Sequence, residues 1–141
     1  MDYNILPNSD IKVSKICLGT MTWGRQNSQK EAFDQMNYSL ERGINFFDTA
    51  ELYPFPATPD KYAVTEQIIG NWFNETKKRD KVILATKIAG PGDYTAHIRK
   101  SGFKGDSIER ALNSSLKRLN TDYIDLYQLH WPERITNTFG N

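Results

Sequence analysis

The chain has 141 residues, enough for one ordinary hydrophobic core, and its 18 basic and 17 acidic side chains leave a formal net charge of +1. Without a polybasic run or an acidic tail, this balance argues against nucleic acid or an anionic membrane as a partner. Three further features, namely a single cysteine (Cys17), no secretion signal at the start and no run of roughly 18 apolar residues, favour the reducing cytoplasm.

The first third of the chain predicts a hairpin, a strand and a helix. Two short apolar runs around a Pro-Asn-Ser-Asp turn indicate a β-hairpin over residues 3–13, and a short strand over 14–18 follows. The helix begins with a capping box, in which the Ser28 hydroxyl and the Glu31 carboxylate can satisfy the N–H groups of the first turn. Apolar residues at helical spacing then continue it as far as Gly43, namely Ala32, Phe33, Met36 and Leu40.

The rest of the chain alternates strands with helices. We predict strands over 44–50, 81–87 and 122–130, and helices that begin near residue 65 and at a second capping box over 106–109. Residues 89–105, rich in glycine, form a long loop, and residues 131–141 are polar and irregular. Strands that alternate with helices favour an α/β fold with parallel pairing and right-handed crossovers.

The number of strands indicates part of a (β/α)8 TIM barrel. A closed barrel takes about 250 residues, whereas four parallel strands in an open sheet leave two edges with unpaired backbone groups. We therefore expect residues 1–141 to be the N-terminal half of one truncated barrel domain: the hairpin and the first four strands. Its expected partner is the missing C-terminal half-barrel, or a second copy that associates through the open edges.

Ionisable residues stand where three of the apolar strands end. Asp48 closes one strand and has Tyr53 a few residues beyond it, Lys87 closes the next, and His130 closes the last. The carboxyl ends of barrel strands form the rim where active sites lie. Alone, each residue has an ordinary alternative: a turn aspartate, a loop tyrosine, a solvated lysine, a hydrogen-bonded structural histidine. Their occurrence on successive strand ends favours a site.

The chemistry of these four side chains is that of a proton donor. A phenol with a pKa of about 10 is a poor acid unless its anion is stabilised. The ammonium of Lys87 can stabilise the Tyr53 anion, and Asp48 can keep that ammonium charged. His130 can donate a hydrogen bond to a carbonyl oxygen. The spacing of histidines and cysteines predicts no metal site.

Long segments of the chain resemble the aldo-keto reductase family. They read LGTMTWG at 18–24, GINFFDTAELY at 43–53, SLKRL at 115–119 and YIDLYQLHW at 123–131. The proline-bearing loop after Tyr53 and the stretch HWPER at 130–134 are most similar to the bacterial Tas-type branch of this family.

The resemblance implies NADPH-dependent reduction of small aldehydes and ketones, with the catalytic tetrad at Asp48, Tyr53, Lys87 and His130. Tyr53 would give the proton, Lys87 and Asp48 would tune it, and His130 would orient the carbonyl. The implied contacts to NADP(H) are Gly19, Thr20, Met21 and Asp48. The implied substrate contacts are Trp23, Tyr53, His130 and Trp131, although ordinary core packing is the alternative for both tryptophans.

The resemblance also implies that the adenosine 2′-phosphate and the pyrophosphate of the cofactor are bound by loops after the later strands, beyond Asn141. This leaves a second hypothesis open, that of a catalytically inert half-barrel that acts as a binding or interaction module, since a barrel fold alone does not establish activity. A phosphate-binding barrel of another chemistry is a weaker alternative, because such sites usually use the loops after the last strands.

Overall fold

A computed structural model describes residues 1–133. In this part of the chain the elements follow in the order β1 (Tyr3–Ile5), β2 (Lys12–Ser14), β3 (Cys17–Gly19), α1 (Gln29–Glu41), β4 (Phe46–Asp48), α2 (Val64–Thr76), η1 (Arg79–Lys81), β5 (Ile83–Ile88), η2 (Asp93–Thr95), α3 (Ser107–Arg118) and β6 (Leu126–Leu129).

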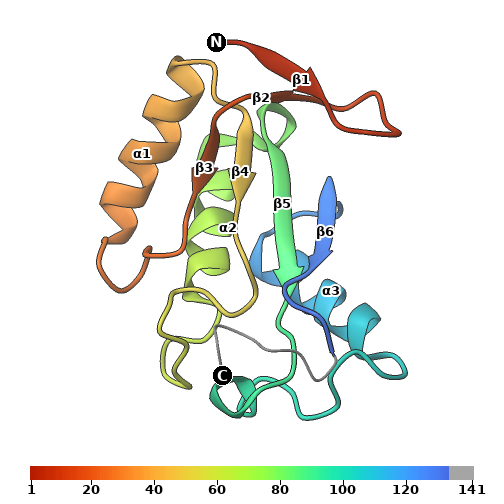
Figure 1. Cartoon of the computed structure of the whole chain (residues 1–141). Coiled ribbons are helices and arrows are strands. Elements are labelled where there is room, and N and C mark those ends of the chain that lie inside the picture. The colour runs from red at the N-terminus through yellow and green to blue at the C-terminus, as the bar shows by residue number, and fades with distance from the viewer. Residues whose placement is uncertain (134–141) are drawn as a thin grey trace, which may run out of the picture.

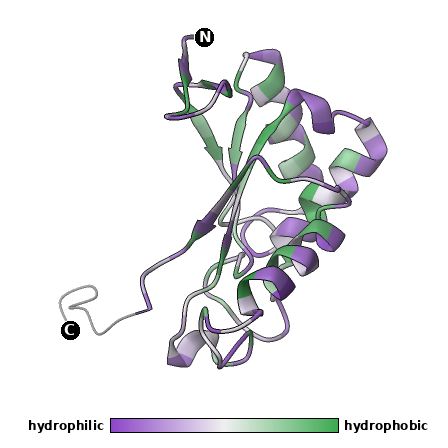
Figure 2. Cartoon of the chain, turned by 90° about the vertical axis from the view of Figure 1, so that its right-hand side faces the viewer, coloured by the Kyte–Doolittle hydropathy of each residue, from purple (hydrophilic) through white to green (hydrophobic). Residues whose placement is uncertain are grey.

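The central sheet is parallel, with the order β3-β4-β5-β6. This confirms the predicted alternation, although the strands are shorter than the apolar runs from which they were predicted. Helices α1, α2 and α3 all lie on one face of the sheet, and the opposite face carries no helix in the described chain (Figures 1 and 2). The arrangement is that of one wall of a barrel, with its helical layer outside.

The hydrophobic core lies between the sheet and the helices. Phe47 and Leu84 point from neighbouring strands into this layer and pack with Trp72 and Ile69 of α2 and with Met36 of α1, and all five are fully buried. Each such side chain stabilises the fold by about 1.5–3 kcal/mol. Side chains alternate between the two faces of a strand. Because Phe47 and Leu84 face the helices, their neighbours in sequence face the other side of the sheet.

The β1–β2 hairpin lies at the amino end of the sheet strands (Figure 1). The Tyr3 hydroxyl donates to the carbonyl of Gly43, at 2.8 Å, and the Ser14 amide donates to the side-chain oxygen of Asn45, also at 2.8 Å, just before β4 begins. The predicted hairpin is thus confirmed, and it covers the end of the sheet that lies away from the β4 and β5 exit loops.

Of the two predicted capping boxes, one is confirmed and one is wrong. Ser28 accepts from the Glu31 amide while the Glu31 carboxylate accepts from the Ser28 amide, as expected. Asp106 makes no such bond to the first turn of α3 and instead pairs with Arg110 one turn on, at 2.8 Å. Asp106 does stand at the cap position, but its backbone (φ −86°, ψ 12°) is not extended like that of Ser28 (φ −71°, ψ 164°), the conformation from which a cap side chain normally reaches the first turn.

One smaller difference lies in the loop after β5. The stretch over 89–105, expected to be irregular throughout, contains the 3-10 turn η2. Of the tail predicted to be irregular, residues 134–141 lie outside the described residues, Arg134 of the HWPER stretch among them. None of the helices in residues 1–133 is both long and apolar enough to cross a lipid bilayer.

Candidate active site

Strand register brings three of the four predicted catalytic residues to the same end of the sheet. Asp48, the last residue of β4, pairs with Gly19 on one side and with Ala85 on the other, and Lys87 lies two residues beyond Ala85. His130 follows directly after β6, and its amide donates to the carbonyl of Ile88 at 3.1 Å. All three therefore sit at carboxyl ends of adjacent parallel strands.

The Lys87 ammonium is anchored by two oxygens from the end of β4. It lies 2.6 Å from Oδ2 of Asp48 and 2.8 Å from the carbonyl oxygen of Thr49. The lysine side chain is 14% exposed and the aspartate 30%. Charge-assisted bonds of this length hold a partly buried ammonium in a single position and offset the loss of its hydration.

Tyr53 completes the group from the loop after β4. Its ring lies with its centre 5.2 Å from the Lys87 nitrogen and 5.7 Å from the centre of the His130 ring, which meets it edge-on. The structure thus brings together all four side chains that the strand ends predicted, with Lys87 in contact with both the acid and the phenol.

The pKa of Tyr53 differs from the sequence-based expectation. Burial, and after it the negative charge of Asp48, raises that pKa to about 12. We expected Lys87 to lower it, but in the structure the lysine ammonium is bound to Asp48 and Thr49 and faces the ring. The expectation of an acidic resting phenol is therefore wrong for this state. At neutral pH Tyr53 keeps its proton, which is the form a proton donor needs.

His130 is a neutral imidazole at physiological pH. Burial, followed by the nearby charge of Lys87, lowers its pKa to about 4. Its Nδ1 is buried and has no hydrogen-bond partner among residues 1–133. A neutral ring carries one N–H, so His130 can donate one hydrogen bond without adding a second cation beside Lys87.

The two tryptophans predicted to line the substrate pocket behave differently. Trp131 is half-buried beside His130, with ring centres 5.1 Å apart, and its indole nitrogen donates to the Pro91 carbonyl at 3.0 Å. Tyr94 stacks on its ring. Trp131 thus lies beside His130 at the end of the sheet where it was predicted to lie.

Trp23 does not fit the predicted substrate role. It is 1% exposed and belongs to the main core cluster, with its indole nitrogen bonded to the side-chain oxygen of Gln35 at 3.0 Å. The prediction of a substrate wall is wrong for this residue, because its loop turns back onto the helical layer. Core packing was the alternative, and it describes Trp23.

Two of the four predicted cofactor residues, Gly19 and Met21, leave open space at the end of β3. A Cβ added at Gly19 would meet no atom within 4 Å, and Met21 is exposed, so the ends of β3 and β4 form an open floor beside the Asp48 carboxylate. Thr20 has a supporting place instead: it is fully buried, and its hydroxyl donates to the Asp48 carbonyl at 2.9 Å. Within residues 1–133 no cluster of three or more His, Cys, Asp or Glu side chains could hold a metal ion.

Sequence reasoning missed three polar residues beside the site. Glu51, in the segment of chain that joins Asp48 to Tyr53, is buried and accepts hydrogen bonds from both Tyr62 and Arg99. A charged residue between Ala50 and Leu52 was a signal for Glu51, because an acid in an apolar run is buried only when it is paired. Arg99 had no such signal, since it lies in a loop without periodicity.

Comparison with known proteins decides the family. The model of the aldo/keto reductase family matches residues 15–139, most of the chain. The chain belongs to the aldo/keto reductase family. It is 44% identical to Protein tas of Escherichia coli over 146 aligned residues, which cover 99% of this chain and 41% of that protein. It is 43% identical to the uncharacterized oxidoreductase YrpG of Bacillus subtilis, covering 96% of this chain and 42% of the relative.

Solved structures agree with this placement. A putative aldo-keto reductase from Pseudomonas aeruginosa superposes with a TM-score of 0.72 at 26% identity, over 92% of this chain and 46% of that one. These neighbours are (β/α)8 barrels, of which this chain supplies the hairpin and the first four strands, as predicted. The chain spans less than half the length of each of these relatives.

Proposed function

We propose that the protein reduces aldehydes and ketones to alcohols with NADPH, and that Tyr53 gives the proton. The observation that carries this proposal is the convergence of a protonated phenol, an anchored ammonium and a neutral imidazole at one edge of the sheet. A group of this kind suits a carbonyl oxygen that gains negative charge as it reacts.

Tyr53 and His130 would hold the carbonyl oxygen. A phenol O–H and an imidazole N–H, whose rings meet edge-on at 5.7 Å, can both donate to one acceptor placed between them. When bound, the reduced nicotinamide supplies a hydride to the carbonyl carbon. The carbon–oxygen double bond becomes a single bond, and the oxygen takes the proton of Tyr53.

Lys87 would stabilise the phenolate that this proton transfer leaves. With a resting pKa of about 12, Tyr53 gives up its proton readily only if a positive charge stands close to the new anion. The Lys87 nitrogen, 5.2 Å from the ring centre, provides that charge, and Asp48 at 2.6 Å holds the lysine in place. In the reverse direction the phenolate would act as the base.

Gly19, Met21 and Asp48 would receive the nicotinamide end of the cofactor. The choice of NADPH over NADH rests on the resemblance alone. The similarity to a Bacillus subtilis protein named aldo-keto reductase YhdN, 38% identical over 94% of this chain, supports the same class of reaction. Small carbonyl compounds as substrates and a cytoplasmic location belong to the same proposal.

A second candidate is an interaction module without catalysis. Within the described chain, β3 and β6 each pair on one side only, and one face of the sheet carries no helix. These features favour a partner that completes the barrel wall, either another half-barrel or a second copy of the chain.

One experiment separates the two candidates. The purified protein is mixed with a small aldehyde and with NADPH or NADH, and the loss of the reduced cofactor's absorbance measures turnover. A separate fluorescence titration measures binding of the cofactor. Turnover that is lost in Tyr53→Phe supports the reductase. Association seen by light scattering, with no turnover by the unmodified protein, supports the module and removes the reductase.

A further inference from the structure

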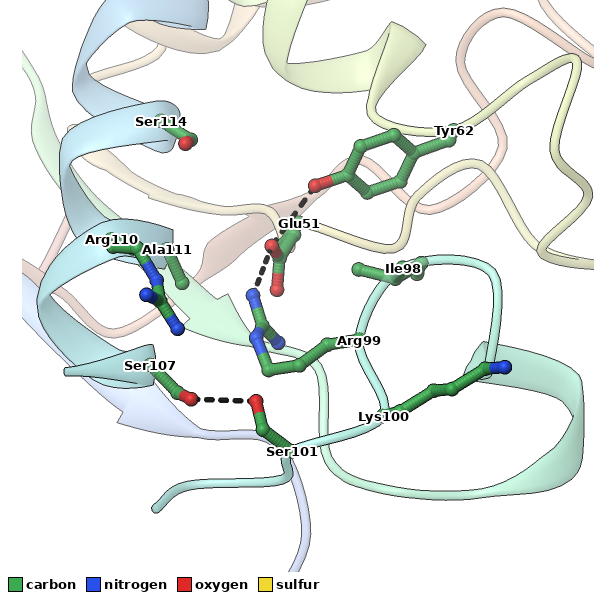
Figure 3. Close-up of a pocket in the computed structure, with 10 residues that line it drawn as sticks. All are labelled: Glu51, Tyr62, Ile98, Arg99, Lys100, Ser101, Ser107, Arg110, Ala111 and Ser114. Carbon is green, nitrogen blue, oxygen red and sulfur yellow. Dashed lines mark hydrogen bonds and ion pairs between the residues drawn. The ribbon is translucent and has the colours of Figure 1, made fainter. Parts of the chain in front are cut away.

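Glu51 is a fully buried carboxylate next to the candidate active site, and the proposed reaction has no use for it. Its side chain is 1% exposed. It accepts hydrogen bonds from the Tyr62 hydroxyl at 3.0 Å, from the Arg99 guanidinium at 2.6 Å and from the Ala89 amide at 2.9 Å. Figure 3 shows it between Tyr62 and Arg99, beside a pocket of about 340 Å³.

These contacts grip the backbone that follows Lys87. The Glu51 amide donates to the Lys87 carbonyl at 3.0 Å, while its carboxylate accepts from the Ala89 amide. Arg99 closes the arrangement, because it donates to the Ala89 carbonyl at 3.0 Å and to the same Glu51 carboxylate. The end of β5 is thereby tied to the segment that carries Asp48 and Tyr53.

The same contacts bear on Tyr53 through packing. Ala89, which Glu51 and Arg99 hold, shares a small buried cluster with Tyr53, Ala50 and Leu52, and Trp131 packs against that cluster. Movement of the backbone at Ala89 would therefore shift both the residues that pack against the Tyr53 ring and the backbone from which the Lys87 side chain extends. A displacement of about 1 Å in a reactive group can lower a rate by about a hundredfold.

We infer that Glu51, with Arg99, is a positioning residue that sets the distance between Lys87 and Tyr53. This inference rests on the proposed function. It assigns Glu51 no contact with substrate or cofactor: the carboxylate acts through the Lys87–Ala89 backbone. Arg99 comes from the loop that also supplies Pro91 and Tyr94 to Trp131, so the same ion pair fastens that wall of the site.

The chain contains a matched control at the opposite end of β5. Asp125 is a mostly buried carboxylate, 14% exposed, that accepts from an arginine, Arg79, and from a β5 backbone amide, that of Leu84, each at 2.8 Å. It repeats the chemistry of Glu51 far from the tetrad. Loss of either carboxylate removes a buried ion pair, but only Glu51 lies beside Lys87 and Tyr53.

The experiment compares Glu51→Gln with Asp125→Asn in the full-length protein. We expect both variants to melt at lower temperature. We expect Glu51→Gln alone to lower kcat for aldehyde reduction by about tenfold or more, with KM and NADPH affinity within about twofold of wild type. In the protein without cofactor, amide hydrogen exchange should quicken around Ala89 in Glu51→Gln and around Leu84 in Asp125→Asn.

The outcomes are distinct. If Glu51→Gln is folded and keeps the kcat of Asp125→Asn while the wild type is active, the positioning role is wrong and the proposed function stands. An inactive wild type removes both. Should Glu51→Gln be insoluble, Arg99→Lys makes the same comparison, because an ammonium does not reproduce the planar fork that joins Glu51 to Ala89; unchanged kcat in that variant overturns the inference.

Discussion

Lys87 and Asp48 form a partly buried ion pair, 2.6 Å from nitrogen to oxygen, that places the ammonium against the face of the Tyr53 ring. Their β-carbons come from neighbouring strands whose register is fixed by Phe47 and Leu84 in the core. The helical layer thus determines where this ammonium, which could favour the anion of the phenol, is held.

Replacing Lys87 by Met should nearly abolish reduction. The phenolate left by proton transfer would lose the ammonium that faces its ring, and the pKa of Tyr53 would stay raised by burial. We expect kcat to fall by about a hundredfold or more, the range of general-acid catalysis. Steady-state kinetics with a small aldehyde measure it, and Lys30→Met is the control, since Lys30 lies exposed on α1. Equal loss in both variants would contradict the role given to Lys87.

His130 predicts a particular dependence of stability on pH. Its pKa is lowered to about 4 in the folded protein, against 6.5 when unfolded, so the unfolded state binds the extra proton between these values. Its contribution to stability is therefore complete above about pH 6.5 and is lost as the pH falls toward 4. The melting temperature of wild type should fall across this window more steeply than that of His130→Gln. Parallel curves would show that the imidazole is not buried as a neutral ring.

The two tryptophans give opposite expectations. Trp23→Ala opens the fully buried core and should cost about 3–5 kcal/mol of unfolding free energy. Trp131→Ala, half-buried beside His130, should cost less stability and should change the relative kcat/KM for bulky and small aldehydes. Denaturant unfolding and competition between two aldehydes measure these effects. An unchanged substrate preference in Trp131→Ala would remove that residue from the pocket wall.

The capping sites provide a test of local stability. Ser28→Ala removes a capping-box bond and should cost about 1 kcal/mol. Asp106→Ala removes only an exposed pair with Arg110, worth about 0–1 kcal/mol, because its carboxylate makes no bond to the first turn of α3. Chemical denaturation of both variants should rank Ser28→Ala as the more damaging. The reverse order would show that Asp106 caps the helix in solution.

Sequence patterns predicted most of what positions the site. Alternating strands and helices predicted the parallel sheet, and because such strands end at one edge, Asp48, Lys87 and His130 were expected together. The role of Trp23 was harder to predict, since a tryptophan just after a strand can line a pocket or pack in the core. Only the path of its loop determines which of the two it does. The raised pKa of Tyr53 depends on burial by Trp131 and Ala89, which no local pattern contains. Arg99 reaches Glu51 across 48 residues, from a loop without periodicity.

The role of Tyr53 is tested most directly by a single-turnover measurement on Tyr53→Phe with excess protein, NADPH and a small aldehyde. We expect NADPH to bind with nearly wild-type affinity, while the rate of nicotinamide oxidation in the chemical step falls by about 10²–10⁴-fold. Oxidation at the wild-type rate in this variant would contradict the assignment of Tyr53 as the proton donor.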